Sequence, residues 1–359
     1  MQILFVKLGS IGDIVHALPA LAAVRRALPG ASVSWVVERR AAEILRDNPQ
    51  VNRLIEIDTK ALRRWPVSGE TLLAPRQQLR RLRASAFDLS IDFQGLLKSA
   101  AIAWLSGAPR RVGFAREALR EPLSRLMLTE SVGVPLRTHV IRKNLALAAG
   151  ALGIDVPEEA RDFEFPIGVA REHELEAEQM SARVGGEFAI LNPGGGWPTK
   201  LWSAERYGAL ADELWRRHAL RSIVTYGPGE RELAEAVEAA SDERAARAES
   251  PSLKGFYALA RRAAVYVGGD TGPTHLAVAA GAPVVGLFGP TEWWRNGSPR
   301  EEDICVERTD TGCRTDCHRR ACSAWVCMDI EVERVAAAVG ERLGRRAARR
   351  KSEVEVVGG

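Results

Sequence analysis

Short apolar runs alternate with longer segments of mixed polarity along the first half of the chain, and glycine-containing turns separate them. The apolar runs at residues 3–7, 33–38 and 89–93 predict three buried strands. The segment from about residue 13 to Leu28 predicts a helix that Pro29-Gly30 ends. Apolar strands that alternate with helices are typical of a parallel sheet covered on both faces.

The same pattern restarts after a charged helical segment at about residues 170–186. Four further apolar strands follow, each ending in a turn with glycine or proline: residues 188–191, 222–226, 264–267 and 284–288. This organisation predicts an α/β protein with two doubly wound, Rossmann-like parallel-sheet domains, residues 1–170 and 171–342. Because ligands bind at the carboxyl ends of such strands, we expect a cleft shared by the domains. Residues 343–359 are basic and then glycine-terminated, and we expect a disordered tail.

Length, composition and charge narrow the function classes. At 359 residues the chain fits two domains, and 46% hydrophobic and 27% charged residues are ordinary for a globular protein. The chain has no apolar run of about 18 residues and no basic region ahead of a long apolar N-terminal stretch, so we expect a cytoplasmic protein. The net charge of +4 does not by itself predict nucleic-acid binding. Arginine pairs concentrate in the first half, which suits an acidic substrate or a membrane surface, although solvated helix faces explain single pairs equally well.

A turn at residues 269–275 follows one predicted strand and precedes a short helix. Asp270, Thr271 and Gly272 surround the predicted helix N-terminus, and the following proline fits a first turn, where no backbone N–H is needed. The free N–H groups and the helix dipole attract phosphate at such an end, and His275 would add a donor. A helix capped by Asp or Thr without any ligand explains the turn about as well.

Two further segments favour a phosphate site. Gly194, Gly195 and Gly196 follow the first strand of the second half, and three consecutive glycines favour a close ligand approach or an anion-binding nest. Lys200 would bring a mobile positive charge to a diphosphate, although it would also fit an ordinary surface position. Glu230 lies just past a strand, where nucleotide-binding folds place the acid that binds ribose, or it simply begins a helix.

Four motifs are spread over the chain. They are Lys-x-x-Ser-x-Gly-Asp at 7–13, Asn-Pro-Gly-x5-Lys-x-Trp at 192–202, Gly-Asp-Thr-Gly-Pro-Thr-His-Leu-Ala at 269–277 and Phe-Gly-Pro-Thr at 288–291. In combination they resemble glycosyltransferase family 9, the lipopolysaccharide heptosyltransferases. The segments 92–100 and 120–123 are similar to the branch that adds the first heptose. The resemblance extends from Met1 to about Arg342.

This resemblance implies a GT-B architecture of two facing Rossmann-like domains and an inverting transferase that takes heptose from ADP-heptose. The C-terminal domain would hold the donor. The residues that match the family's pattern there are Lys200, Asp270, Thr271, Gly272 and His275 at the diphosphate, Glu230 at the ribose, Leu253 near the adenine, and Gly194, Gly195 and Thr199 in the same site.

The resemblance also places a catalytic base in the N-terminal domain. Inversion by one displacement needs a base for the acceptor hydroxyl, and Asp13 matches the base proposed for the family, with Ser10 and Gly12 beside it on the acceptor side. Ser10 and Asp13 also have the spacing of a capping box, which would engage the carboxylate. His16, one turn later, would tune Asp13 or simply pack in the helix.

The charge that develops on the leaving diphosphate must be neutralised. The chain contains no Asp-x-Asp pair, which is the usual metal clamp of nucleotide-sugar enzymes. We therefore expect no catalytic metal and no cofactor, with catalytic Lys200 and the helix dipole stabilising the leaving group.

The implied acceptor is the acidic sugar Kdo on phosphorylated lipid A. Lys98, Arg120, Arg63 and Arg64 are the cations expected to meet its anionic groups. Because such an acceptor lies in the inner leaflet, we expect peripheral contact with the inner face of the inner membrane.

All five cysteines lie between Cys305 and Cys327. Their spacing does not match the paired cysteines of common zinc sites, and a cytoplasmic location argues against stable disulfides. Cys313, Cys317, Cys322 and Cys327 are candidates for a structural metal cluster, and reduced thiols without a role are the alternative.

Other functions stay open at this point. A family 9 relative with another donor sugar or acceptor, such as a second-heptose transferase, would share most of the motifs. A nucleotide-diphosphate binder without transfer activity would share the donor motifs but would not need Asp13. A nicotinamide dehydrogenase is disfavoured, because no Gly-x-Gly-x-x-Gly follows the first strand.

Overall fold

The chain folds into two compact units, Met1–Gly168 and Val169–Gly359. The structure is a computed structural model that describes residues 1–58, 82–313 and 317–357, with the side chains from residue 349 onward left out. Within that part of the chain, no helix combines the length and the apolar character needed to cross a bilayer.

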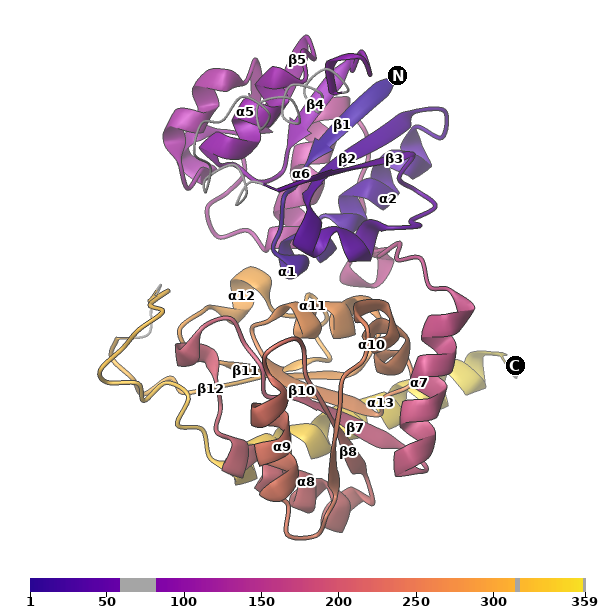
Figure 1. The fold of residues 1–359 in the computed structure, drawn as a ribbon, viewed down its shortest axis with the longest axis vertical. Helices are drawn as coiled ribbons and strands as arrows, with labels where there is room; N and C mark the ends of the chain where they lie inside the picture. The colour runs from indigo at the N-terminus through magenta and orange to yellow at the C-terminus, as the bar shows by residue number, and fades with distance from the viewer. Residues whose placement is uncertain (59–81, 314–316, 358–359) are drawn as a thin grey trace, which may run out of the picture. The chain divides into compact units, whose positions relative to one another are not determined.

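The first unit is built on a six-stranded sheet in which neighbouring strands are parallel (Figure 1). Its strands are β1 (Gln2–Val6), β2 (Ser32–Glu38), β3 (Arg53–Ile57), β4 (Leu89–Asp92), β5 (Arg110–Phe114) and β6 (Glu130–Val132). The spatial order β3-β2-β1-β4-β5-β6 is that of the doubly wound nucleotide-binding fold. The order reverses between β1 and β4, so a ligand site is expected at the carboxyl ends of these two strands.

The helices of the first unit are α1 (Ile11–Val15), α2 (Leu18–Ala27), η1 (Arg39–Leu45), α5 (Leu97–Leu105), η3 (Arg116–Ala118), η4 (Pro122–Met127), α6 (Val140–Leu152) and η5 (Ala160–Asp162). The single helix expected from about residue 13 to Leu28 is therefore two helices. The reason is Pro19, which has no N–H to donate and is tolerated only in a first turn, so that a new helix begins at Leu18.

The second unit repeats the topology of the first. Its parallel strands are β7 (Phe188–Asn192), β8 (Arg221–Thr225), β9 (Ala246–Glu249), β10 (Val265–Gly269), β11 (Val284–Phe288) and β12 (Ile304–Glu307). Their order is β12-β11-β10-β7-β8-β9, so the reversal falls between β7 and β10. The predicted α/β class with two doubly wound parallel sheets is confirmed.

The helices of the second unit are α7 (Arg171–Val184), η6 (Pro198–Lys200), α8 (Ala204–His218), α9 (Arg231–Ala239), α10 (Leu253–Ala260), α11 (Gly272–Ala279), α12 (Trp293–Asn296) and α13 (Val332–Val357). The helix α13 runs through residues 343–357, for which a disordered tail was expected. Six of the eight residues 343–350 are arginine or alanine, which are strong helix formers.

Candidate active site

In the first unit, packed aromatic rings lie next to the point where the chain leaves β1. The Phe5 ring packs against the rings of Trp35 and Phe93 at centroid distances of 5.4 and 4.7 Å. The indole Nε1 of Trp35 also donates to the carbonyl of Lys7 at 3.1 Å. These buried contacts determine where the chain leaves β1, and with it the positions of Lys7 and the loop that follows.

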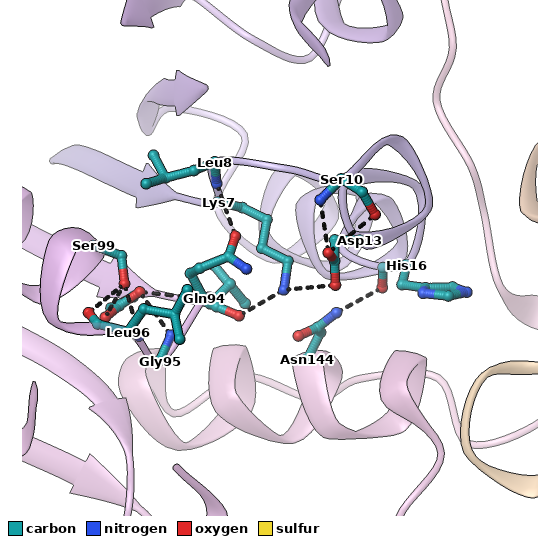
Figure 2. A network of polar contacts seen from close by, with 12 residues as sticks. Lys7, Leu8, Ser10, Asp13, His16, Gln94, Gly95, Leu96, Ser99 and Asn144 are labelled. Atoms are coloured by element: carbon teal, nitrogen blue, oxygen red, sulfur yellow. Dashed lines mark hydrogen bonds and ion pairs between the residues drawn. The ribbon is translucent and has the colours of Figure 1, made fainter. Parts of the chain in front are cut away.

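Asp13 uses only one carboxylate oxygen to cap its own helix. The backbone N–H and the hydroxyl of Ser10 both donate to Oδ2, at 2.7 and 3.2 Å. The other oxygen, Oδ1, lies 3.6 Å from the Nζ of Lys7 (Figure 2). With 38% of its side chain exposed, Asp13 retains an accessible carboxylate. The capping box is thus present, and it leaves Oδ1 available for chemistry.

Lys7 is a buried cation to which the sequence interpretation assigned no role. Its side chain is only 5% exposed, and Nζ donates to the carbonyl of Phe93 at 2.9 Å while facing Asp13. Figure 2 shows this side chain lying between the Asp13 carboxylate and the segment after β4 that contains Gln94. The ammonium therefore ties the loop after β1 to the loop after β4.

Asp92, the last residue of β4, organises the second of these loops. Its carboxylate accepts from the backbone N–H groups of Gln94 and Gly95 at 2.9 and 3.2 Å and from the hydroxyl of Ser99 at 2.9 Å. Burial raises the pKa of Asp92 to about 6, although these hydrogen bonds and the charge of Lys7 act in the opposite direction. The amide of Gln94 in turn accepts from the backbone of Leu8 at 3.0 Å, so the two loops form one network (Figure 2).

The expected acceptor residues have different surroundings. Ser10 is exposed and Gly12 is buried within α1. Lys98 is exposed, and its ammonium lies 3.6 Å from the buried carboxylate of Glu38. Arg120 is exposed. Arg63 and Arg64 lie outside the described residues.

His16 is buried in the first unit near a second histidine. Its ring lies 6.3 Å from that of His139, and its backbone carbonyl accepts from Asn144 at 2.9 Å. His16 is the C-cap residue of α1, in the turn that leads to α2.

In the second unit, the turn after β10 contains a buried ionic cluster centred on Asp270. The Nζ of Lys200 lies 2.5 Å from Oδ2 and donates to the Asp270 carbonyl at 3.1 Å. His275 Nε2 lies 3.3 Å from Oδ1, and the side-chain amide of Asn296 donates to the same oxygen. The side chains of Lys200, Asp270 and His275 are 13%, 6% and 7% exposed. Residues separated by many positions in the sequence thus converge beside the N-terminus of α11.

The surroundings of Asp270 keep it ionised. Burial raises its pKa, but the hydrogen bonds and charges of His275 and Lys200 outweigh burial and hold the pKa well below its ordinary value. An ionised carboxylate only accepts hydrogen bonds, so it holds donors in place and does not itself bind phosphate. The structure therefore gives Asp270 a supporting position, with Lys200 and His275 as the cation and the donor that it orients.

The helix α11 presents its first turn at this cluster. Thr271 is its N-cap residue and Gly272 its first residue. The hydroxyl of Thr274 donates to the Gly269 carbonyl and lies 2.9 Å from the hydroxyl of Tyr266, which anchors the turn to β10. The first N–H groups of any helix lack an acceptor within the helix, so this turn can bind an anion.

The glycines after β7 are not equivalent. A Cβ at Gly194 would lie 2.5 Å from the carboxyl group of Glu230, whereas one at Gly196 would meet nothing within 4 Å. A Cβ at Gly195 would lie 3.1 Å from Leu201 and 3.4 Å from Thr271. Gly194 thus allows the loop after β7 to approach Glu230, whose Oε2 accepts from the backbone of Gly227 at 2.9 Å. The predicted residues after β7, β8 and β10 therefore lie at the same edge of the sheet.

Three contacts in this region were not expected from the sequence. Lys200 lies over the Trp197 ring, 4.3 Å from its centroid, a cation–π contact that orients the ammonium. Thr199 donates its hydroxyl to the carbonyl of Arg319 at 2.7 Å, and its backbone carbonyl accepts from the indole of Trp325 at 2.8 Å. Thr199, expected to bind the donor, thus anchors the cysteine-containing segment.

Leu253 begins α10 next to a well-defined cap. Ser252 accepts from the backbone of Gly255 at 3.0 Å and donates its hydroxyl to Glu176 at 2.5 Å. Leu253 is partly buried there.

The five cysteines are free thiols. Burial raises the pKa of Cys327, and the nearby Cys317, Cys313 and Cys322 add to this effect. In the ranges that the structure describes, no three side chains of His, Cys, Asp or Glu are arranged to hold a metal ion.

Known proteins resemble this chain over most of its length. The family model described as "Glycosyltransferase family 9 (heptosyltransferase)" matches residues 76–342. The chain belongs to glycosyltransferase family 9. It is 35% identical to lipopolysaccharide heptosyltransferase 1 of Pseudomonas aeruginosa, over 81% of this chain and 79% of that protein, and 31% identical to the Escherichia coli K12 protein of the same name, over 81% and 89%.

A solved structure resembles this family 9 glycosyltransferase over nearly the whole chain. E. coli heptosyltransferase WaaC with ADP is 25% identical, with a TM-score of 0.77 over 95% of this chain and all of that one. The GT-B class expected from the motifs is thus confirmed. The family model covers Lys200 and Asp270 but begins at residue 76, after Asp13.

Proposed function

We propose that this glycosyltransferase moves a heptose from ADP-heptose to the Kdo sugar of the lipopolysaccharide inner core. The relatives at 35% and 31% identity carry the name lipopolysaccharide heptosyltransferase 1, and solved structures of E. coli WaaC hold ADP or ADP-2-deoxy-2-fluoro heptose. The observation that carries the proposal is the buried cluster of Lys200, Asp270 and His275 beside the first turn of α11. It supplies a positioned cation and a helix N-terminus for a diphosphate.

The donor diphosphate lies, in this proposal, between Lys200 and the first turn of α11. Asp270 holds the ammonium and His275 before the substrate arrives, so little reorganisation is needed when charge develops on the leaving ADP. Lys200 is the catalytic residue on this side, and Thr271, Gly272 and His275 contribute the remaining donors. Glu230 accepts from the ribose hydroxyls beside Gly194 and Gly195, and Leu253 borders the adenine. The leaving group is stabilised by these fixed charges and dipoles.

Asp13 is the general base of the proposed reaction. Oδ2 is held by Ser10, and Oδ1 takes the proton of the acceptor hydroxyl as the bond to the anomeric carbon forms and the bond to ADP breaks. One displacement of this kind inverts the configuration at that carbon. Lys7 keeps the carboxylate in place from its buried side.

The acceptor side rests on cations of the first unit. Lys98 and Arg120, with Arg63 and Arg64, meet the carboxylate of Kdo and the phosphates of lipid A. Binding of such an acceptor brings the protein to the inner face of the inner membrane as a peripheral protein.

Asp13→Asn is the direct test, because asparagine can still accept the Ser10 cap but cannot remove a proton. With ADP-heptose and a Kdo-lipid A acceptor, kcat should fall by roughly 10²–10⁴-fold while the affinity for ADP-heptose stays unchanged. Ser10→Ala is the matched control, since it weakens the cap and keeps the base. Full turnover by the Asp13→Asn variant would exclude the general-base role.

Substrate panels separate the proposal from its alternatives. ADP-heptose, and not UDP- or GDP-sugars, should raise the melting temperature of the protein. A relative named lipopolysaccharide heptosyltransferase 3, 24% identical over 79% of this chain, makes acceptors that already carry heptose a necessary comparison. Preference for such an acceptor would indicate a later transferase, and donor binding without product on any acceptor would indicate a binding protein.

A further inference from the structure

A pocket lined by arginines lies in the second unit, at the sheet edge opposite to the donor residues. Its volume is about 430 Å³. It is formed where β8 and β9 begin, together with the ends of α7 and α9 and the loop between α9 and β9. The charged side chains that line it are Arg183, Arg221, Arg244, Arg247 and one acid, Glu238.

Protein carboxylates neutralise only part of this positive charge. Glu249 accepts from Arg183 at 2.7 and 2.9 Å and from Arg247 at 3.0 Å, and is itself 9% exposed. Arg221 and Arg244 form no ion pair with any residue in the described ranges. Four guanidinium groups thus stand against the carboxylates of Glu238 and Glu249, which leaves two positive charges in excess.

Three of the four guanidinium groups, those of Arg183, Arg221 and Arg247, are held in place before any ligand binds. Arg221 lies over the Trp215 ring, 4.5 Å from its centroid, and donates to the carbonyl of Arg244 at 3.2 Å. That contact supports a backbone φ of +50° at Arg244, a left-handed conformation that is uncommon for arginine. Glu238 accepts from the backbone N–H of Ala248 at 2.8 Å, so its carboxylate is already engaged.

We propose that this pocket binds a phosphate anion, either a free phosphate compound or the phosphate of a lipid headgroup. Arginine forks match phosphate oxygens and form strong charge-assisted hydrogen bonds with them. The volume lies in the range of small-molecule sites, so a diphosphate with part of the group that carries it would fit.

This site is separate from the donor cluster. The five residues of β8 lie between the pocket and the turn of Glu230, which at about 3.3 Å per residue is a separation of roughly 17 Å. The inference therefore does not depend on the proposed transferase reaction.

The first test is equilibrium dialysis of the full chain with labelled inorganic pyrophosphate. Because the donor cluster also attracts this anion, it is measured in the Lys200→Gln background. Adding Arg244→Gln and Arg247→Gln should weaken the remaining binding by at least roughly tenfold, since two charge-assisted contacts are lost. The matched control is Arg216→Gln with Arg217→Gln, which removes equal charge from α8 outside the pocket.

Vesicle flotation distinguishes the two sources of phosphate. Phosphatidylcholine vesicles with and without phosphatidylglycerol are compared for the wild type, the pocket variant and the control. If the pocket variant alone loses binding to anionic vesicles, and pyrophosphate displaces the wild type, the ligand is a lipid phosphate. If only pyrophosphate binding falls, the ligand is a free compound.

The proposal is overturned if the pocket variant matches the control in both experiments. Arg244 and Arg247 are exposed, so their replacement should leave the fold intact. Unchanged circular dichroism and melting temperature must accompany any loss of binding. If the double variant is unfolded, Arg244→Lys replaces it. Lysine keeps the charge but lacks the forked guanidinium group, so this variant should still bind pyrophosphate less tightly than the wild type.

Discussion

Replacing Asp270 by asparagine should destabilise the second unit and weaken donor binding. Asparagine keeps the volume of the side chain but leaves the ammonium of Lys200, 13% exposed, without its counter-charge. Removing one partner of a buried ion pair costs about 3–5 kcal/mol, and the remaining amide oxygen places the expected loss near the lower end, at about 3 kcal/mol. For a unit of this size, that corresponds to a fall in melting temperature of roughly 6–12 °C.

The dependence of this loss on pH follows from the pKa of Asp270. The folded-state pKa is held below the value of about 3.9 expected for an unfolded chain. The carboxylate therefore contributes its full stabilisation above pH ~4, and that contribution is lost as the pH falls further. The difference in unfolding free energy between wild type and Asp270→Asn should be constant near neutral pH and should shrink below pH ~4.

A double-mutant cycle with Lys200→Met isolates the ion pair. Denaturant unfolding of the single and double variants measures the coupling energy. The double variant should be less destabilised than Asp270→Asn alone, because it leaves no unpaired buried charge. A melting temperature within about 2 °C of wild type for Asp270→Asn, together with additive single effects, would refute the assignment of Asp270 as the anchor of Lys200.

Three further changes test other parts of the two sites. Gly194→Ala should raise the KM for the donor, because its Cβ would displace the carboxyl group of Glu230. The control Gly196→Ala places its Cβ in open space and should leave KM unchanged. Equal effects of the two variants in steady-state kinetics would contradict the contact between Gly194 and Glu230. Asp92→Asn should remove a pH-dependent term. Burial raises the folded-state pKa of Asp92 to about 6, so its contribution to the free energy of unfolding is present below pH ~4 and lost as the pH rises through 6. This loss amounts to about 3 kcal/mol in the wild type. Unfolding titrations of the Asp92→Asn variant should not show it. Lys7→Met should lower kcat by roughly tenfold with little change in donor KM, since it releases the carboxylate of Asp13; a change confined to KM would argue against this positioning role.

The apolar pattern of the sequence predicted the central strands of both sheets but not the outer ones. The central strands β1, β2, β4, β7, β8, β10 and β11 were predicted, whereas β3, β5, β6, β9 and β12 were not. The missed strands carry charged residues, as in Ala-Arg-Ala-Glu of β9 and Ile-Cys-Val-Glu of β12. Strands near a sheet edge are less completely covered by helices, so their polar residues obscure the apolar run.

For the candidate site, the sequence likewise predicted the segments involved but not the contacts between their side chains. Motifs identified the segments that hold Asp13, Lys200, Glu230 and the turn at residues 269–275, because each follows a strand and carries distinctive chemistry. They did not reveal that Asp270 anchors Lys200, that Thr199 anchors the cysteine-containing segment, or that Lys7 faces Asp13. Arg183 and Arg247 likewise meet at one glutamate although far apart in the chain.

By itself, then, the sequence determined the α/β class, the repeated doubly wound organisation and the segments that bear the chemistry of family 9. These features depend on local periodicity and on motifs of neighbouring residues, which a linear chain displays directly. Only the tertiary structure decided which charges are paired, which glycine is crowded and where four arginines share a pocket. Such relations depend on the order of the strands and on burial, which bring together residues far apart in the chain, as with Thr199 and Arg319, 120 positions apart.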